Sequence, residues 1–124
     1  GRSRVNSVLR GEVWAVDFEA QTHRQEPGKK ERPALVIQTN ALNKAGHPTT
    51  IVVPGTSKVE SLPPDDHFPL RVRIQRTGDL KYDTELLVDQ IRAISNARFL
   101  FRYCTLGANH LKRVEEALRL LTGR

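Results

Sequence analysis

The sequence predicts a mainly β (α+β) fold, a small curled sheet or barrel with one helix at its C-terminal end. Short apolar segments recur along the chain and are separated by polar stretches that contain Gly and Pro, the pattern of a protein built from short strands. Helical spacing of apolar residues over several turns occurs only near the C-terminus. The chain has 124 residues, enough for one modest core.

Three strands are expected in the first half of the chain. Residues 12–18 alternate between Val13 and Ala15 on one side and larger apolar residues on the other, so both faces should be covered. Residues 33–38 form a short apolar run that predicts a central strand, with Pro33 at its first position. Residues 40–48 predict a turn with room for one helical turn, and 49–54 a β-branched strand. Polar loops are expected at 19–31 and 55–67.

The second half predicts two further strands and the terminal helix. Residues 68–74 alternate apolar residues with Arg71 and Arg73, and 84–94 resume strand character with an interruption at Asp89 and Gln90. A short helix is expected to start at Ser95. The C-terminal helix should turn one apolar face to the sheet, formed by Leu111, Val114, Leu118 and Leu121.

The charge and the single cysteine limit the class of protein. The net charge is +6; without Arg2 and Arg4 it is +4, from 18 basic and 14 acidic residues. Residues 1–7 look like an added or trimmed terminus, which leaves 8–124 as one expected domain. The basic excess is compatible with nucleic acid but does not establish it. Cys104 cannot form an internal disulfide, which suits a reducing cytoplasm, and its apolar neighbours predict a buried, inert thiol.

Common catalytic motifs are absent from the sequence. The four histidines are scattered without the close spacing of a zinc site. The chain has no P-loop, no dinucleotide-binding glycine pattern and no nucleophile elbow. Any catalysis is therefore expected to need neither a metal nor a nucleotide cofactor.

Arg32, Thr56 and Ser57 lie at the ends of two predicted strands and could converge on one phosphate. Neighbouring strands lie about 5 Å apart, and the arginine fork binds phosphate oxygens and stabilises charge that develops in a transition state. RNA cleavage needs no external nucleophile, because the 2′-hydroxyl lies beside the scissile phosphate. The alternative is that Arg32 is a loop charge and the hydroxyls stabilise a turn. The residues alone favour this simpler interpretation.

Five segments, taken in order, resemble the MazF/PemK family of toxin endoribonucleases. They are "RGEVWAVDF", "RPALVIQTNALN", "TTIVVPGTS", "DQIRAI" and "VEEALRLL", and the resemblance covers roughly residues 9 to 121. It implies the small SH3-like barrel of the CcdB/PemK toxins with its C-terminal helix, a homodimer, and neutralisation by a MazE-like antitoxin. The implied activity is metal-independent, sequence-specific cleavage of single-stranded mRNA by 2′-hydroxyl attack, giving 2′,3′-cyclic phosphate and 5′-hydroxyl ends.

The resemblance also implies roles for individual residues. Arg32 matches the catalytic arginine, which acts in proton transfer and phosphate stabilisation, and Thr56 matches the catalytic hydroxyl residue. Asp89 and Gln90 match an acidic–Gln pair near the RNA groove, although a bulge or packing role is equally open. The remaining RNA-binding residues are Ser57 beside Thr56 and the loop residues Gln25 and Glu26. A phosphate path would be lined by Lys29, Lys30, Arg32 and Lys58; loop lysines are usually only solvated, but four cations around one site favour a groove.

The loop 19–31 departs from the family pattern, since "THRQEPGKK" replaces Gly-x-Glu-Gln-Gly. Gln25 and Glu26 are therefore approximate counterparts, and a different recognition sequence is expected. Gly55 stands where relatives carry a larger residue, either to let the substrate backbone approach or to loosen the loop. Phe68 and Tyr82 are candidates for base stacking, but core or turn packing is favoured for both.

Two other function classes remain open at this point. One is a non-catalytic SH3-like module that binds RNA or a peptide. The other is a toxin that acts on a protein target, as CcdB relatives do. The Arg32 and Thr56 pair argues against the second, because the protein-poisoning relatives lack it.

Overall fold

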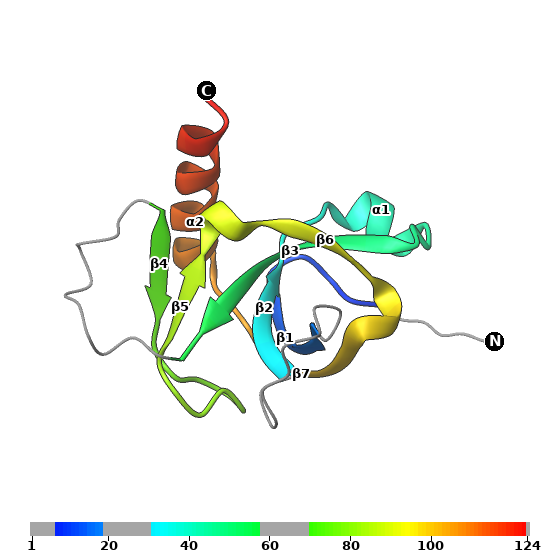
Figure 1. The fold of residues 1–124 in the computed structure, drawn as a ribbon, viewed down its shortest axis with the longest axis horizontal. Helices are drawn as coiled ribbons and strands as arrows, with labels where there is room; N and C mark the ends of the chain where they lie inside the picture. Colours follow the sequence, from blue (N-terminus) through cyan, green and yellow to red (C-terminus); the bar gives the residue numbers. More distant parts are fainter. Residues whose placement is uncertain (1–6, 19–30, 58–69, 124) are drawn as a thin grey trace.

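The computed structural model describes residues 7–18, 31–57 and 70–123, which form a seven-stranded sheet with a C-terminal helix (Figure 1). Every strand pairing is antiparallel. The strands are β1 (Glu12–Asp17), β2 (Glu31–Val36), β3 (Thr49–Thr56), β4 (Arg71–Ile74), β5 (Thr84–Leu87), β6 (Arg92–Ser95) and β7 (Phe99–Thr105). The helices are α1 (Asn40–Lys44) and α2 (Ala108–Leu121), with 3₁₀ turns η3 (Val88–Gln90) and η4 (Asn96–Arg98).

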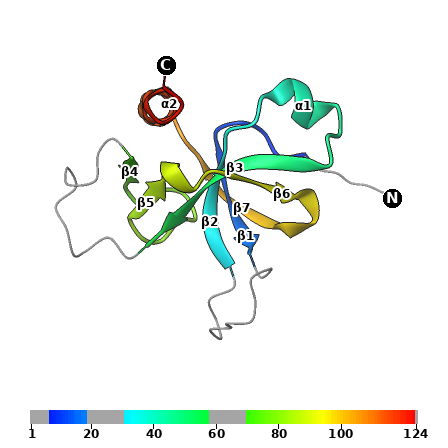
Figure 2. The same ribbon diagram turned by 45° about the horizontal axis from the view of Figure 1, so that its top comes forward.

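Strand β3 organises the sheet, whose order is β4-β5-β3-β2-β1-β7 with β6 also paired to β3. The start of β3, from Thr49 to Val52, pairs with β6, and its end, at Gly55 and Thr56, pairs with β5. In Figure 2, β4 and β5 therefore lie on one side of β1 and β2, and β6 lies on the other. The outer strands β4 and β7 are not paired with each other in the described residues, so the mainly β prediction is confirmed with a curved sheet that stays open.

Two apolar cores lie on opposite faces of the central strands. Alternation along β2 directs Leu35 into the core beneath α2, while Ala34 and Val36 enter a second core with Val16 and Val52. All five side chains are fully buried. Residues 33–36 therefore belong to a central strand covered on both faces, and the predicted strand end at residue 38 was two residues late.

Helix α2 covers β4 and η3. Val114 and Ala117 are its buried residues, and Leu111 and Leu118 pack against the core at its margin. Leu121 was predicted on the buried face but is 40 % exposed, because the last turn of the helix extends beyond the sheet (Figure 1). None of the helices in the described residues combines the length and apolar character that a membrane crossing requires.

The segment after Ser95 begins with the predicted short helix and then continues as a strand that was not predicted. Only η4 is helical, with the Ser95 hydroxyl accepting a hydrogen bond from the backbone of Ala97. Residues 99–105 form β7, which pairs with β1 along its length. The run "FLFRYC" is aromatic and alternating, which suits a strand, and tertiary pairing with β1 gives it a partner that local sequence does not reveal.

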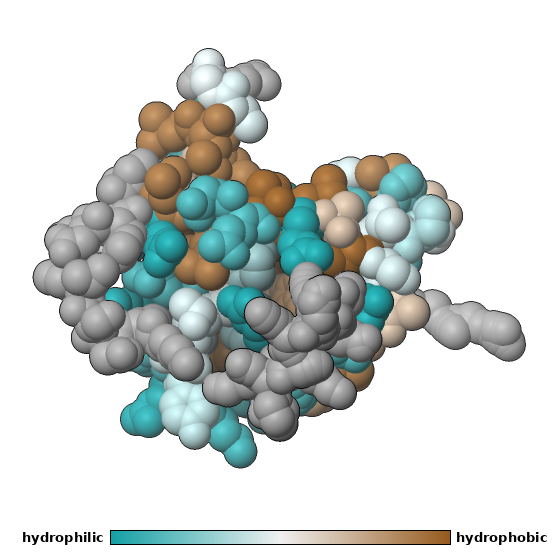
Figure 3. Space-filling view, in the orientation of Figure 1, coloured by the Kyte–Doolittle hydropathy of each residue, from teal (hydrophilic) through white to brown (hydrophobic). Residues whose placement is uncertain are grey.

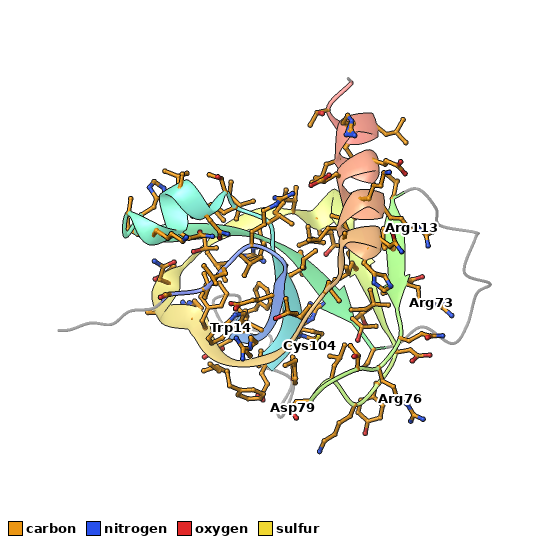
Figure 4. All side chains as sticks on the ribbon, turned by 180° about the vertical axis from the view of Figure 1, so that it is seen from behind. Trp14, Arg73, Arg76, Asp79, Cys104 and Arg113 are labelled. Carbon is orange, nitrogen blue, oxygen red and sulfur yellow. The ribbon has the colours of Figure 1, made fainter. Side chains whose placement is uncertain are left out.

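Cys104 lies in β7 and is half-buried rather than buried. Burial, and to a smaller extent the carboxylate of Asp79, raise the pKa of its thiol. Figure 4 shows the Asp79 side chain on the hairpin next to this part of β7, and Asp79 donates its backbone N–H to the Tyr103 carbonyl at 2.9 Å. A raised pKa disfavours the thiolate at neutral pH, which fits the expected inert thiol.

Candidate active site

Arg32 lies inside β2 rather than in a loop before it. The strand begins at Glu31, and Arg32 is registered opposite Val16 of β1. The prediction that the strand starts at Pro33 was therefore two residues late. The ladder with β3 begins only at Ala34, which leaves room at position 33 for a residue without a backbone N–H.

A hydrogen bond joins Arg32 to the end of β3. Its guanidinium Nη2 donates to the carbonyl oxygen of Gly55 at 3.2 Å. Thr56 follows directly as the last residue of β3 and is half-buried, and Ser57 is exposed just beyond it. The structure thus brings the arginine and the two hydroxyl residues to one place, as the strand-end argument expected.

Arg92 is a second cation at this place that the sequence did not single out. Its Cζ lies 5.2 Å from the centroid of the Phe18 ring, and the Cζ of Arg32 lies 5.9 Å from the same centroid. Both guanidiniums therefore contact one aromatic ring, which favours cations electrostatically. Phe18 itself packs against the second core, and Arg92 begins β6 opposite Val52 of β3.

The two arginines influence each other electrostatically. Burial, and secondarily the charge of Arg92, lower the pKa of Arg32 from its ordinary value. An arginine nonetheless remains a cation at neutral pH, because its ordinary pKa lies far above 7. Two like charges held near each other favour an anion between or beside them, and a phosphate group meets that requirement with oxygens that match the arginine fork.

The end of β3 is anchored from the other side by β5. Thr56 is registered opposite Glu85, a buried residue whose carboxylate lies 3.9 Å from Arg71 and 3.7 Å from Arg73. These two arginines were predicted to lie half-exposed on their strand and do so. The ion pairs tie β4 to β5 next to Thr56, so the hydroxyl residue is carried by a braced strand rather than by a turn.

The remaining predicted site residues fall into two groups. Asp89 and Gln90 are exposed in η3, the turn that contacts β3 and leads into Arg92. They interrupt the strand, as predicted. Outside the described residues lie Gln25, Glu26, Lys29, Lys30, Lys58 and the aromatic candidate Phe68. Within the described ranges, no group of three or more His, Cys, Asp or Glu side chains is placed to hold a metal ion.

Gly55 is required by packing inside the sheet. A Cβ built on it would lie 2.8 Å from Cγ2 of Thr84, with a Leu86 methyl and the Glu85 carbonyl oxygen at 3.4 Å. Thr84 is itself buried, so it has little room to move. The sequence suggested two reasons for this glycine, approach of the substrate backbone or a loose loop. The structure shows a different one, the close contact between β3 and β5.

Gly55→Ala is expected to destabilise the protein by about 1–3 kcal/mol, because overpacking forces β3 and β5 apart. The same shift moves the carbonyl that holds Arg32. Thermal unfolding followed by circular dichroism measures the effect. Gly107→Ala is the matched control, since no atom lies within 4 Å of its added Cβ. A Gly55→Ala protein as stable as the Gly107→Ala protein would contradict this packing argument.

Comparisons with known proteins identify the family and the fold of this chain. The family model described as the PemK-like, MazF-like toxin of type II toxin–antitoxin systems matches residues 9–122. Endoribonuclease EndoA of Bacillus subtilis (strain 168) is 29 % identical over 113 residues, which cover 91 % of this chain and 92 % of that protein.

Two solved structures share the fold. Deinococcus radiodurans MazF superposes with a TM-score of 0.72 at 22 % identity, covering 97 % of this chain and 100 % of that one. A mycobacterial endoribonuclease in complex with its cognate antitoxin gives a TM-score of 0.69 at 18 % identity, covering 96 % of each chain. The family match spans both β2, which carries Arg32, and the end of β3, which carries Thr56. The chain belongs to the PemK-like, MazF-like toxin family of type II toxin–antitoxin systems.

Proposed function

We propose that this protein is an endoribonuclease toxin that cleaves single-stranded mRNA in the cytoplasm at a short recognition sequence. The observation that carries the proposal is the convergence of Arg32 and Thr56: the guanidinium is held by the Gly55 carbonyl directly before the threonine. Family membership and the similarity to Endoribonuclease EndoA support the same activity.

The proposed reaction is attack by the substrate's own 2′-hydroxyl on the adjacent phosphate. The new bond joins the 2′-oxygen to phosphorus, the bond from phosphorus to the 5′-oxygen breaks, and the proton lost by the 2′-hydroxyl is balanced by one gained at the leaving oxygen. The products are a 2′,3′-cyclic phosphate and a 5′-hydroxyl. The nucleophile is part of the substrate, so the protein supplies alignment and charge stabilisation rather than a metal-bound water.

Arg32 and Thr56 would both stabilise the transition state, each by donating hydrogen bonds to different phosphate oxygens. Negative charge builds on the non-bridging phosphate oxygens, and the Arg32 fork donates to them while remaining a cation. The Thr56 hydroxyl donates to a further oxygen. Partial burial strengthens both interactions, because low local polarity screens charges less than water does. Burial and Arg92 also lower the pKa of Arg32, which makes its participation in proton transfer less costly.

Arg92 is proposed to bind the same phosphate or its neighbour as a second cation. Each phosphate contact on a single strand contributes about 0.7 to the slope of log affinity against log salt concentration. Arg92→Gln is therefore expected to weaken RNA binding and to lower that slope by about 0.7. Fluorescence anisotropy over a salt series measures it, and an unchanged slope would exclude Arg92 from phosphate binding. Arg119→Gln, exposed on α2, is the control.

The proposed RNA path continues onto residues that the structure does not describe. Lys29, Lys30 and Lys58 would follow the phosphates, and Gln25 and Glu26 would contact bases together with Ser57, Asp89 and Gln90. The altered sequence of the 19–31 loop supports a recognition sequence that differs from those of relatives.

Two protein partners complete the proposal. A MazE-like antitoxin would neutralise the toxin, as solved MazE–MazF complexes of Deinococcus radiodurans illustrate for a related pair. A second copy of this chain would form a homodimer. Within the described residues, β7 is an outer strand of the sheet and carries Leu100 and Phe101, which are 49 % and 47 % exposed. Exposed apolar side chains on an edge strand favour a protein contact.

Incubation with a long single-stranded RNA in the presence of EDTA tests the proposal. We expect cleavage at defined sites, new 5′ ends that polynucleotide kinase labels without prior phosphatase treatment, and 3′ ends that carry a cyclic phosphate. Tight RNA binding by the intact protein without any cleavage would contradict the enzymatic proposal and favour a non-catalytic RNA-binding module.

A further inference from the structure

A pocket of about 580 Å³ lies beside the end of β3, on the connection between β4 and β5. Its lining residues are Ser57, Gln75, Arg76, Lys81, Tyr82 and Asp83. It adjoins the candidate active site, because Gly55 and Thr56 pair with β5 and Ser57 comes next in the chain. Apart from Ser57, none of its residues contributes to the site described above.

Tyr82 is the one aromatic side chain among the described residues that line this pocket. It is 67 % exposed, so the expectation that it packs in the core or a turn is wrong. Its surroundings are polar: the end of this connection presents hydrophilic surface, in contrast to the hydrophobic surface over α2 (Figure 3). A large aromatic ring that serves no core is available for stacking by a nucleic-acid base.

The backbone around Tyr82 is held in place by several hydrogen bonds. The Asp83 carboxylate accepts from the backbone N–H of Arg76 at 3.0 Å, and the Tyr82 carbonyl accepts from the Thr84 hydroxyl at 3.1 Å. Thr77 and Leu80 exchange backbone hydrogen bonds of 3.2 and 2.9 Å at the tip. The backbone that carries the Tyr82 ring is therefore held in one conformation, which lowers the entropic cost of binding.

Charge around the ring favours an anion. Among the described residues that line the pocket, Arg76 and Lys81 are cations and Asp83 is the one carboxylate, which already accepts a hydrogen bond from the backbone N–H of Arg76. Figure 4 shows Arg76 projecting from this end of the molecule. A stacking ring with two cations and the Ser57 hydroxyl beside it is the combination that binds a nucleotide of single-stranded RNA without requiring a particular base.

We propose that this pocket is a subsite for the nucleotide that flanks the scissile phosphate, with its base on Tyr82 and its phosphate near Arg76 and Lys81. The inference rests on the proposed RNA cleavage and extends it. Ser57 lies two residues beyond Gly55, whose carbonyl holds Arg32, and two residues of extended chain span roughly 7 Å. One nucleotide of an extended strand bridges that distance, so the RNA would leave the reacting phosphate towards the hairpin.

Binding to a single-stranded DNA pool of random sequence tests the subsite independently of cleavage, since DNA lacks the 2′-hydroxyl and stacking does not need it. Fluorescence anisotropy should show that Tyr82→Ala weakens binding about tenfold, whereas Tyr82→Phe binds like the wild type. Leu120→Ala, exposed on α2, should have no effect. Equal affinity of the Tyr82→Ala and wild-type proteins would overturn the subsite, even if the wild-type protein cleaves RNA.

A second experiment locates the subsite along the RNA and distinguishes RNA binding from antitoxin binding at this pocket. With RNA substrates shortened one nucleotide at a time from either end of the cleavage site, the kcat/KM difference between wild type and Tyr82→Ala should disappear at one particular truncation. That truncation identifies the side on which the subsite lies. Loss of antitoxin binding by Tyr82→Ala, with DNA affinity and RNA cleavage unchanged, would overturn the proposal and assign the pocket to the antitoxin.

Discussion

Arg32→Ala is expected to slow RNA cleavage about 10³-fold or more, because it removes the fork that stabilises the pentacoordinate phosphate. The loss should appear in the single-turnover rate constant at saturating enzyme, since the interaction strengthens as the reaction proceeds. The fold should survive. Arg32 is half-buried, and within the described residues it donates one hydrogen bond, to a backbone carbonyl, so its removal is expected to cost about 1 kcal/mol of stability.

Arg32→Lys tests the chemistry more sharply than the alanine variant. Lysine keeps the positive charge but lacks the planar pair of donors, and we expect most of the activity to be lost. Arg119→Ala controls for the removal of a positive charge elsewhere on the protein. Full activity of Arg32→Ala would remove this residue from the mechanism, and full activity of Arg32→Lys would show that the positive charge is sufficient without the planar donors.

Thr56→Val is expected to lower the single-turnover rate about 10²-fold, the effect of losing one donor to a charged oxygen. Valine has nearly the shape of threonine and also suits a strand end, so the position of β3 should be kept. Thr56→Ser retains the hydroxyl and should keep most of the activity. Equal rates for Thr56→Val and wild type would show that the hydroxyl is not used.

The double variant Arg32→Ala with Thr56→Val shows whether the two residues act as a unit. If both contact the same phosphate, the loss in the double variant should be smaller than the product of the two single losses. If the rate loss in the double variant equals the product of the two single losses, the two residues contribute independently, which would contradict contact with one shared phosphate.

The sequence predicted the scaffold of the site well, because its signals are local. The unbroken apolar run 33–38 and the β-branched run 49–54 each indicated a strand, and adjacent strands place Arg32 near Thr56. The exact start of β2 was not predictable, since the pairing of Glu31 with Asp17 extends the strand through two residues of polar character. Pro33 also suggested that the strand starts there. In the structure Pro33 is paired with β1 but not with β3, so the strand can extend past it.

The features that were missed depend on contacts between distant segments. Arg92 and Phe18 meet because β6 and the end of β1 contribute to the same apolar core, and no spacing in the sequence links residues 18 and 92. The need for Gly55 follows from its register against β5, which places Thr84 over it. Tyr82 is exposed on the connection between β4 and β5, and the sequence around a single aromatic residue does not indicate whether its side chain is buried.

The most direct test of the account is a single-atom change in the substrate. After the cleavage sites have been mapped by sequencing, an RNA with one deoxynucleotide at the 5′ side of the scissile bond removes only the proposed nucleophile. We predict that this RNA binds with the affinity of the unmodified RNA and is not cleaved at that site, with or without EDTA. Cleavage of the deoxy-substituted bond at a normal rate would contradict attack by the 2′-hydroxyl and with it the proposed roles of Arg32 and Thr56.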